Sequence, residues 1–203
     1  MNIIIGTSNL AKIQFYEHLL EGTKVEVVKC KALEMEEDLY DIVANSRNKA
    51  LLYAVSYQNL ALSDDTGFFI PKMNNEPGCA VRRWGGRLPD DISDEDWLQF
   101  FVNKIREHEL PLECYRKTVV TLALPNGSHF FLEQVFNAEI RDNPQPRYIE
   151  GGPLSAYLYY PHLHKFNCEL TKAEIYELNQ EFFQRVQSAI MSFGSKEIDC
   201  KSF

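Results

Sequence analysis

Two adjacent carboxylates, Asp64 and Asp65, follow the apolar run Leu60-Ala61-Leu62 and precede Gly67. A short apolar run of this kind predicts a buried strand, and the glycine predicts a turn after it. Ligands of α/β folds gather at the carboxyl ends of strands, so the pair is a candidate site for a divalent metal or for general-base chemistry. The alternative is a polar turn in which the two carboxylates cap backbone N–H groups.

A second candidate site lies at the start of the chain. Residues 2–5 form a short apolar run that Gly6 interrupts, and Thr7-Ser8-Asn9 supplies cap residues for a helix that follows. The N–H groups of such a helix start attract anions, while Asn9 adds an amide and Lys12 adds a charge one turn later. This suits a phosphate, although the Gly-rich Walker signature is absent. The alternative is an ordinary capped surface helix on which Lys12 is solvated. If Lys12 binds phosphate, its replacement by Ala should weaken that binding far more than folding, because a lysine in the first turn of an exposed helix has little packing to lose.

The elements that must position these residues follow an α/β order. Periodicity, caps and turn residues define each of them. We predict strands at 2–5, 24–28 and 60–66 with extension to 70, a hairpin of 118–124 and 129–135, helices at 10–20, 40–57 and 94–108, a loop at 141–153, and a last helix after the capping box at 171–174.

Composition limits what this fold can do. The chain has 203 residues, of which 45% are hydrophobic, and we expect one domain over residues 1–193 with a polar tail at 194–203. A net charge of −8 argues against a general nucleic-acid or anionic-membrane surface. No apolar run reaches the roughly 18 residues of a membrane span, and the cysteines are scattered without a C-x-x-C pair. We therefore expect a cytoplasmic protein with reduced thiols and with no membrane or nucleic-acid partner.

Several short motifs resemble those of the inosine triphosphate pyrophosphatase (Ham1) family. They are, in the family's order, residues 7–12 (T-x-N-x-x-K), the acidic Leu33-Glu34-Met35-Glu36, residues 45–50 (N-x-x-x-K-A), residues 64–67 (D-D-[ST]-G), Pro77-Gly78, and Arg83 with Gly86. Several matches in one order are far more specific than any one alone.

The resemblance implies hydrolysis of deaminated purine nucleoside triphosphates, such as ITP and XTP, to monophosphate and pyrophosphate, which cleanses the nucleotide pool. It also implies a homodimer and an elongated mixed-sheet α/β fold with two lobes around a central nucleotide-binding cleft. Mg²⁺ takes one or two carboxylates plus substrate phosphates, which suits Glu34 and Asp65 as its ligands. The catalytic residues it implies are Asp64, Asp65, Lys12 and Lys49, and the substrate-binding residues are Thr7, Asn9, Lys12, Thr66, Gly67, Arg83, Tyr157 and Tyr159.

The second half of the chain departs from this family. Where the family has G-F-G-Y-D-P, residues 155–161 keep aromatic side chains but place Tyr160 at the Asp. The family's S-H-R near the last helix is replaced by the region of Phe182-Phe183-Gln184. Those motifs help to read the purine base, so we expect altered or relaxed base selectivity, with Arg83 or Gln184 as candidates for the polar contacts.

Three further clusters have two interpretations each. The basic segment 82–87 suits phosphate clamping and base stacking, or is a basic loop with Trp84 packed inward. The tyrosines of 157–160 offer a stacking surface or take part in ordinary packing or a subunit interface. His162 and His164 would share one face of a strand and could bind a metal, but no Cys or carboxylate accompanies them at ligand spacing. We interpret the two histidines as surface residues.

Two other functions are open. One is a nucleotide-binding relative without catalysis, which the changed segment 157–161 favours and the intact Lys12, Lys49 and aspartate pair oppose. The other is a phosphohydrolase similar to the haloacid dehalogenases, read from Asp-Asp-Thr-Gly. In that family the nucleophile and the acid are separated by one residue, whereas Asp64 and Asp65 are adjacent and would point to opposite faces of a strand.

Overall fold

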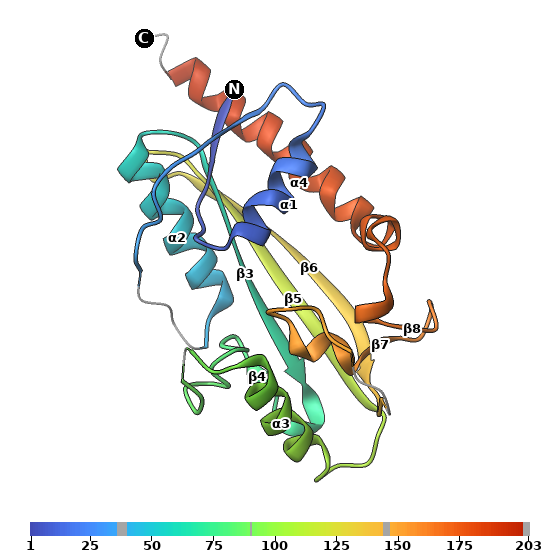
Figure 1. Ribbon diagram of the computed structural model, residues 1–203. Helices are drawn as coiled ribbons and strands as arrows, with labels where there is room; N and C mark the ends of the chain where they lie inside the picture. The colour runs from blue at the N-terminus through green and yellow to red at the C-terminus, as the bar shows by residue number, and fades with distance from the viewer. Residues whose placement is uncertain (36–39, 90, 144–146, 201–203) are drawn as a thin grey trace. The chain divides into compact units, whose positions relative to one another are not determined.

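The computed structural model describes residues 1–35, 40–89, 91–143 and 147–200 (Figure 1). The strands are β1 (Asn2–Ile5), β2 (Glu26–Val28), β3 (Ala61–Ile70), β4 (Glu76–Gly78), β5 (Leu112–Ala123), β6 (His129–Ile140), β7 (Leu158–Tyr160) and β8 (Lys165–Phe166). The helices are α1 (Leu10–Leu20), α2 (Ile42–Tyr57), α3 (Asp94–Ile105) and α4 (Lys172–Cys200). Short 3-10 turns occupy Pro71–Met73, Pro153–Ala156 and Asn167–Glu169. The mixed α/β class expected from the sequence is confirmed.

The strands form one mixed sheet in the order β2-β1-β3-β5-β6-β7-β8, with β4 paired to β3. The first strand lies between β2 and β3 and is parallel to both, with Ile4 opposite Val28 and Ala61. A tight turn joins β5 to β6, in which the Gly127 N–H donates to the Leu124 carbonyl at 3.0 Å. The predicted hairpin is therefore confirmed, and both of its strands are longer than expected.

The chain divides into two compact units. Unit 1 comprises Met1–Asp65, Thr118–Gln134 and Asn179–Phe203, and unit 2 comprises Thr66–Lys117 and Val135–Leu178. Each unit has its own buried core and is described by itself.

The core of unit 1 lies on both faces of its part of the sheet. Because successive side chains of a strand point to opposite faces, Ile3 and Ile5 pack with α1 and α4, whereas Ile4 packs against α2. Tyr16 and Phe182 belong to the first cluster. Figure 1 shows α1 and α4 on one side of β3 and α2 on the other. The two aspartates of β3 therefore have a different helix on each side.

The core of unit 2 is aromatic. Helix α3 begins after Ser93, whose hydroxyl accepts a hydrogen bond from the Asp96 N–H at 3.0 Å. Within α3, Trp97 and Phe101 stack with ring centroids 5.4 Å apart. Trp84 is 1% exposed and packs against both rings. The inward-packed interpretation of Trp84 is thus confirmed.

Helix α4 begins at the predicted capping box. The Glu174 carboxylate accepts from the Thr171 N–H at 2.9 Å, and the Thr171 hydroxyl accepts from the Glu174 N–H at 3.3 Å. Its buried face carries Phe182, Val186 and Ile190 at helical spacing. The backbone remains helical to Cys200, so the helix does not end at residue 194, where we expected the polar tail to start.

The strand that carries Asp64 and Asp65 does not turn at Gly67. It continues to Ile70, so the predicted extension to residue 70 is confirmed. The expectation of a turn at Gly67 is wrong, and both aspartates lie within β3 rather than at its end. A Cβ at Gly67 would lie 2.6 Å from Cε2 of Phe69 and 3.2 Å from the Gly78 carbonyl oxygen. Close packing against the Phe69 side chain and the neighbouring strand β4 therefore favours a glycine at this position. The alternative of a polar turn at the aspartate pair is excluded with it.

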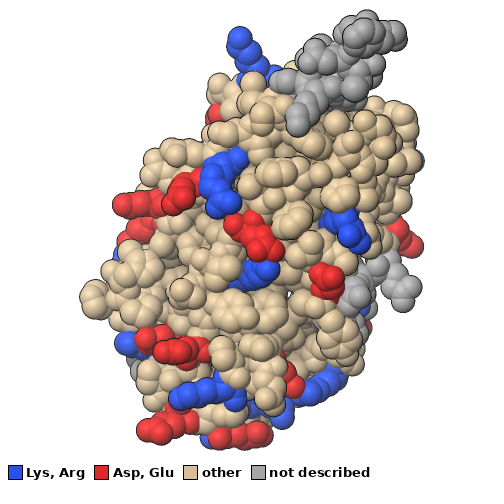
Figure 2. Space-filling model, turned by 180° about the vertical axis from the view of Figure 1, so that it is seen from behind, with Lys and Arg blue, Asp and Glu red and all other residues tan. Residues whose placement is uncertain are grey.

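The charged side chains do not gather on the face seen in Figure 2. Lys and Arg are interspersed there with Asp and Glu on a largely uncharged surface. On this face, the described basic residues form no single stripe of the kind that follows a nucleic-acid backbone. Among the helices described, none combines the length and the apolar character needed to cross a bilayer.

Candidate functional site

The loop between β1 and α1 is held by its own side chains. The Thr7 hydroxyl accepts a hydrogen bond from the Asn9 N–H at 3.1 Å, and the Asn9 side-chain oxygen accepts one from the Lys12 N–H at 3.3 Å. Asn9 therefore caps α1, as its position in the sequence predicts. A Cβ at Gly6 would lie 3.0 Å from the Tyr53 ring, so the close packing of α2 requires the glycine. The start of α1 presents the partial positive charge of a helix N-terminus.

Lys12 forms an ion pair with Asp64. Its ammonium lies 2.9 Å from Oδ2 of Asp64, and the two side chains are 30% and 8% exposed. The other carboxylate oxygen of Asp64, Oδ1, is buried and has no hydrogen-bond partner among the residues that the structure describes. Tyr16 lies one turn beyond Lys12 on α1, and burial raises its pKa well above the ordinary value, with a further increase from the Asp64 charge. Asp64 thus faces α1. The alternative of a solvated surface lysine does not hold, and the expectation that Lys12 has little to lose for folding is wrong.

Asp65 faces the opposite helix. Its Oδ2 accepts a hydrogen bond from the side-chain amide of Asn45 at 2.9 Å. Asn45 is 4% exposed and lies in the first turns of α2, which Asp41 caps by accepting from the Val43 and Ala44 N–H groups. Lys49 follows one turn later on the same face of α2 and is half-buried. The α2 face next to β3 therefore carries an amide and a lysine.

Buried hydroxyl groups fix α2 to the sheet below these residues. Ser46 is fully buried, and its hydroxyl lies 3.1 Å from the Ser63 carbonyl oxygen and 2.8 Å from the Thr121 hydroxyl. The Ser63 hydroxyl in turn donates to the Gly6 carbonyl at 2.7 Å. These bonds connect α2, β3, β5 and the end of β1. Satisfied buried polar networks of this kind rigidify the backbone around a site.

Glu34 follows β2 in an irregular segment. Its side chain is exposed, and the preceding residue, Leu33, donates its N–H to the Tyr53 hydroxyl on α2 at 2.9 Å. Glu36, the last residue of the acidic motif, lies outside the described residues. The pairing of Glu34 with Asp65 around a metal ion stays a prediction.

The carboxylates of β3 have the chemistry of a Mg²⁺ site. Among the described residues no group of three or more His, Cys, Asp or Glu side chains could by itself hold a metal ion. Mg²⁺ does not require such a cage, since it usually keeps several waters and binds one or two carboxylates plus substrate phosphates. The Asp65 carboxylate, which Asn45 orients, and the exposed Glu34 carboxylate are hard oxygen donors, so the residues present fit this ion.

The predicted site residues do not all fall in one unit. Thr66, Gly67, Arg83, Tyr157 and Tyr159 belong to unit 2, and the remaining predicted residues belong to unit 1. The structure thus brings together Lys12 with Asp64, and Asp65 with the α2 face that carries Lys49. Contacts of the unit 2 residues with a substrate stay predictions.

The basic segment of unit 2 is largely used for folding. Glu76 accepts a hydrogen bond from the Trp84 indole at 2.9 Å and two from Arg87 at 2.6 and 3.0 Å. Arg82 pairs with Asp94 and donates to the Ile92 carbonyl. Arg83 is half-buried. Arg82 and Arg87 therefore have structural partners within unit 2.

The tyrosines of residues 157–160 are packed rather than open. Tyr157 is 6% exposed and meets Phe101 edge-on with ring centroids 5.8 Å apart. Tyr160 is 2% exposed. Tyr159 is half-buried, and the Arg141 guanidinium carbon lies 4.0 Å above its ring. Tyr157 and Tyr160 leave little ring surface for a base, whereas Tyr159 is covered by a cation.

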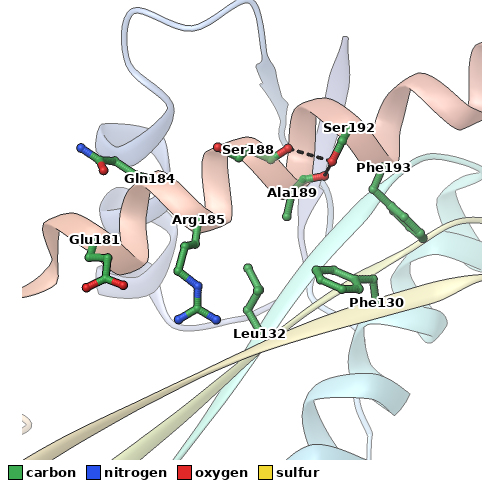
Figure 3. A pocket seen from close by; sticks show the side chains of 9 residues that line it. All are labelled: Phe130, Leu132, Glu181, Gln184, Arg185, Ser188, Ala189, Ser192 and Phe193. Atoms are coloured by element: carbon green, nitrogen blue, oxygen red, sulfur yellow. Dashed lines mark hydrogen bonds between the residues drawn. The ribbon is translucent and has the colours of Figure 1, made fainter.

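Two further predicted groups are the histidine pair and Gln184. His162 and His164 lie in the turn between β7 and β8 rather than on a strand, and His164 has a φ of 53°. Gln184 lines a groove between β6 and α4 in unit 1, together with Arg185 and the apolar Leu132 (Figure 3). None of the predicted catalytic or metal-binding residues lines this groove.

Sequence reasoning missed Asn45 as a site residue. The available signal was the N-x-x-x-K spacing, which places Asn45 and Lys49 on one face of a helix. It also missed the hydroxyl network, because the partners are far apart along the chain and no local pattern connects them.

Comparisons with known proteins agree with this arrangement. The model of the Ham1 family matches residues 3–175. The dITP/XTP pyrophosphatase of Thermoanaerobacter pseudethanolicus is 26% identical over 181 residues, which are 86% of this chain and 87% of that protein. The dITP/XTP pyrophosphatase of Legionella pneumophila is 32% identical over 106 residues, about half of each chain at 52% and 53%.

Solved structures share the fold. A HAM1 protein from Coxiella burnetii superposes with a TM-score of 0.80 at 19% identity, covering 95% of this chain and 99% of that one. The Staphylococcus aureus Ham1 protein gives a TM-score of 0.73 at 20% identity, covering 91% and 98%. The family model spans most of the chain and includes the β3 aspartates with their partners on α1 and α2, so this chain belongs to the Ham1 family.

Proposed function

We propose that this protein hydrolyses nucleoside triphosphates to the monophosphate and pyrophosphate in a Mg²⁺-dependent reaction. The observation that carries the proposal is the aspartate pair of β3, with Lys12 bound to Asp64 and the α2 amide bound to Asp65. The relatives named dITP/XTP pyrophosphatases support deaminated purines, such as ITP, dITP and XTP, as substrates and support a role in cleansing the nucleotide pool.

In this proposal, basic residues bind the phosphates and an acidic residue activates the attacking water. Lys12, Lys49 and the N-terminus of α1, with Thr7 and Asn9, would hold the phosphates and stabilise the leaving pyrophosphate. Asp65 would orient a water and accept its proton while the water oxygen bonds to the α-phosphorus and the bridging oxygen leaves with the pyrophosphate. A bound Mg²⁺, held by Asp65 and Glu34, supplies neutralisation of the triphosphate charge.

Recognition of the base falls to residues of unit 2 in this proposal. Arg83 and Tyr159 are half-buried and are the candidates with accessible surface, whereas Tyr157 is almost fully covered. Thr66 and Gly67 adjoin Asp65 in β3 and are assigned to substrate through their backbone. We further propose that residues 1–193 act as one catalytic domain, that the protein is a homodimer, and that it works in the cytoplasm.

A second candidate is a nucleotide-binding relative that has lost catalysis. The burial of Tyr157 and Tyr160, in the segment that departs from the family, favours it. A binding protein would have no use for a proton acceptor in a site that also has Lys12 and Lys49, so hydrolysis remains our conclusion.

The test is a pyrophosphate-release screen of the purified protein with ITP, dITP, XTP, GTP and ATP, with Mg²⁺ and with excess EDTA. We expect release from at least one deaminated triphosphate that stops in EDTA. Binding of triphosphates without release of pyrophosphate would contradict the proposal and favour the second candidate.

A further inference from the structure

Asp65 is held by a side chain that no role above accounts for. The amide nitrogen of Asn45 lies 2.9 Å from Oδ2 of Asp65. An ionised carboxylate can only accept hydrogen bonds, so the Asn45 amide is the donor. A hydrogen bond to a charged group is stronger than one between neutral groups. A carboxylate has about four lone-pair directions, and the Asn45 bond constrains the orientation of Asp65 while it occupies one of them.

The position of Asn45 is itself fixed. The side chain is 4% exposed, so it cannot swing into solvent. Asp41 caps the turn before it, and the neighbouring Ser46 hydroxyl contacts the Ser63 carbonyl oxygen and the Thr121 hydroxyl. The turn of α2 that carries Asn45 is therefore bound to β3, the strand that carries Asp65.

Asp64 does not share this arrangement. It lies on the other face of β3 and is held by the Lys12 ammonium at 2.9 Å. The two adjacent carboxylates are thus oriented by different groups, one cationic and exposed in part, the other neutral and buried. The Asn45 amide orients the Asp65 carboxylate and adds no charge of its own.

We propose that Asn45 is a positioning residue that holds the Asp65 carboxylate in the orientation required for metal binding and for water activation. The inference rests on the proposed function and adds a residue to that site. Partners that orient metal ligands typically contribute 10- to 100-fold to affinity or activity, roughly, when they are removed. A role in packing alone would reduce stability and leave those quantities unchanged.

The experiment compares Asn45→Ala and Asn45→Ser with Asn48→Ala in the full chain. Asn48 lies on the same helix, is exposed, and has its side-chain oxygen bonded to the Arg47 guanidinium, so it is the matched control. We would measure kcat and KM for dITP, Mn²⁺ affinity by EPR titration, and Tm. We expect kcat to fall about 10- to 100-fold in both Asn45 variants with KM within about threefold, and Mn²⁺ binding to weaken about 10-fold. Asn48→Ala should match the wild type.

A double-mutant cycle separates positioning from a direct role. If Asn45 acts through Asp65, then Asn45→Ala added to Asp65→Asn should cause little further loss of activity. Wild-type kcat and Mn²⁺ affinity in the Asn45 variants, with only a lower Tm, would overturn the inference. If Asn45→Ala does not fold, the smaller and still polar Asn45→Ser provides the same test. An inactive wild type would refute the proposed function instead, which keeps the two failures distinguishable.

Discussion

Removal of Lys12 should destabilise the protein, because the lysine is the counter-charge of a buried carboxylate. The Asp64 side chain is 8% exposed and its Oδ2 is 2.9 Å from the Lys12 ammonium. Its Oδ1 has no hydrogen-bond partner within the described part of the chain. In Lys12→Met the carboxylate keeps its burial and loses its only ion-pair partner among the described residues. Breaking a fully buried pair from one side costs about 3–5 kcal/mol of folding free energy.

The expected magnitude is smaller than that limit. The Lys12 side chain is 30% exposed, so water reaches its side of the pair and compensates in part. We expect Lys12→Met to lose about 2 kcal/mol, which at a urea m-value of about 2 kcal/mol/M lowers the midpoint by about 1 M. Asp64→Asn should lose less, because the remaining ammonium can be solvated. The double variant should be more stable than Lys12→Met alone.

Urea unfolding followed by far-UV circular dichroism at neutral pH measures all four proteins. Lys24→Met is the matched control, since Lys24 is an exposed lysine of the same unit. Equal midpoints for Lys12→Met and wild type would refute the reasoning and show that Lys12 behaves as a solvated charge. Additive losses in the double variant would show that the two side chains are not coupled.

Two further predictions concern the base and the acid limit of stability. Polar contacts to a base can give a selectivity of about 10⁴-fold, and the family's base-reading motifs are missing here. We therefore expect the ratio of kcat/KM for ITP and XTP to that for GTP and ATP to be well below this value. A sharp preference for ITP and XTP over both GTP and ATP would contradict this. Burial raises the pKa of Glu76, but the Trp84 and Arg87 hydrogen bonds outweigh it and hold that pKa below the ordinary value. Its contribution to stability is therefore present above the unfolded pKa of about 4.3 and is lost as pH falls through the folded pKa. The Tm of Glu76→Gln should be lower than wild type at pH 7 and approach it toward pH 3, and a constant difference would show that Glu76 does not titrate differently on folding.

The aspartate pair shows how far sequence reasoning reaches. An apolar run followed by two carboxylates identifies a buried strand, and its alternation places Asp64 and Asp65 on opposite faces. The sequence does not show which residues contact the two aspartates on those faces, because Lys12 and Asn45 are distant along the chain. It also misjudges Gly67, since a glycine in the sequence suggests a turn, whereas here it packs against the Phe69 ring of its own strand and against the Gly78 carbonyl of β4.

The aromatic residues of unit 2 show the same limit. Trp84 and Tyr157 have the chemistry to stack on a base, and only packing decides whether their rings are open. In the structure both lie in the core around Trp97 and Phe101. The starts of α3 and α4 were predicted correctly, because the acidic turn after Ser93 and the capping box at Thr171 are local signals with local consequences.

The most direct test of the central claim is the rate of pyrophosphate release from dITP by Asp65→Asn at saturating Mg²⁺. The substitution keeps the size of the side chain and removes its charge, its capacity to accept a proton and its strength as a metal ligand. We predict a loss of at least about 100-fold in kcat with a folded protein of near wild-type Tm. Release at the wild-type rate would show that the carboxylate of β3 does not perform the chemistry.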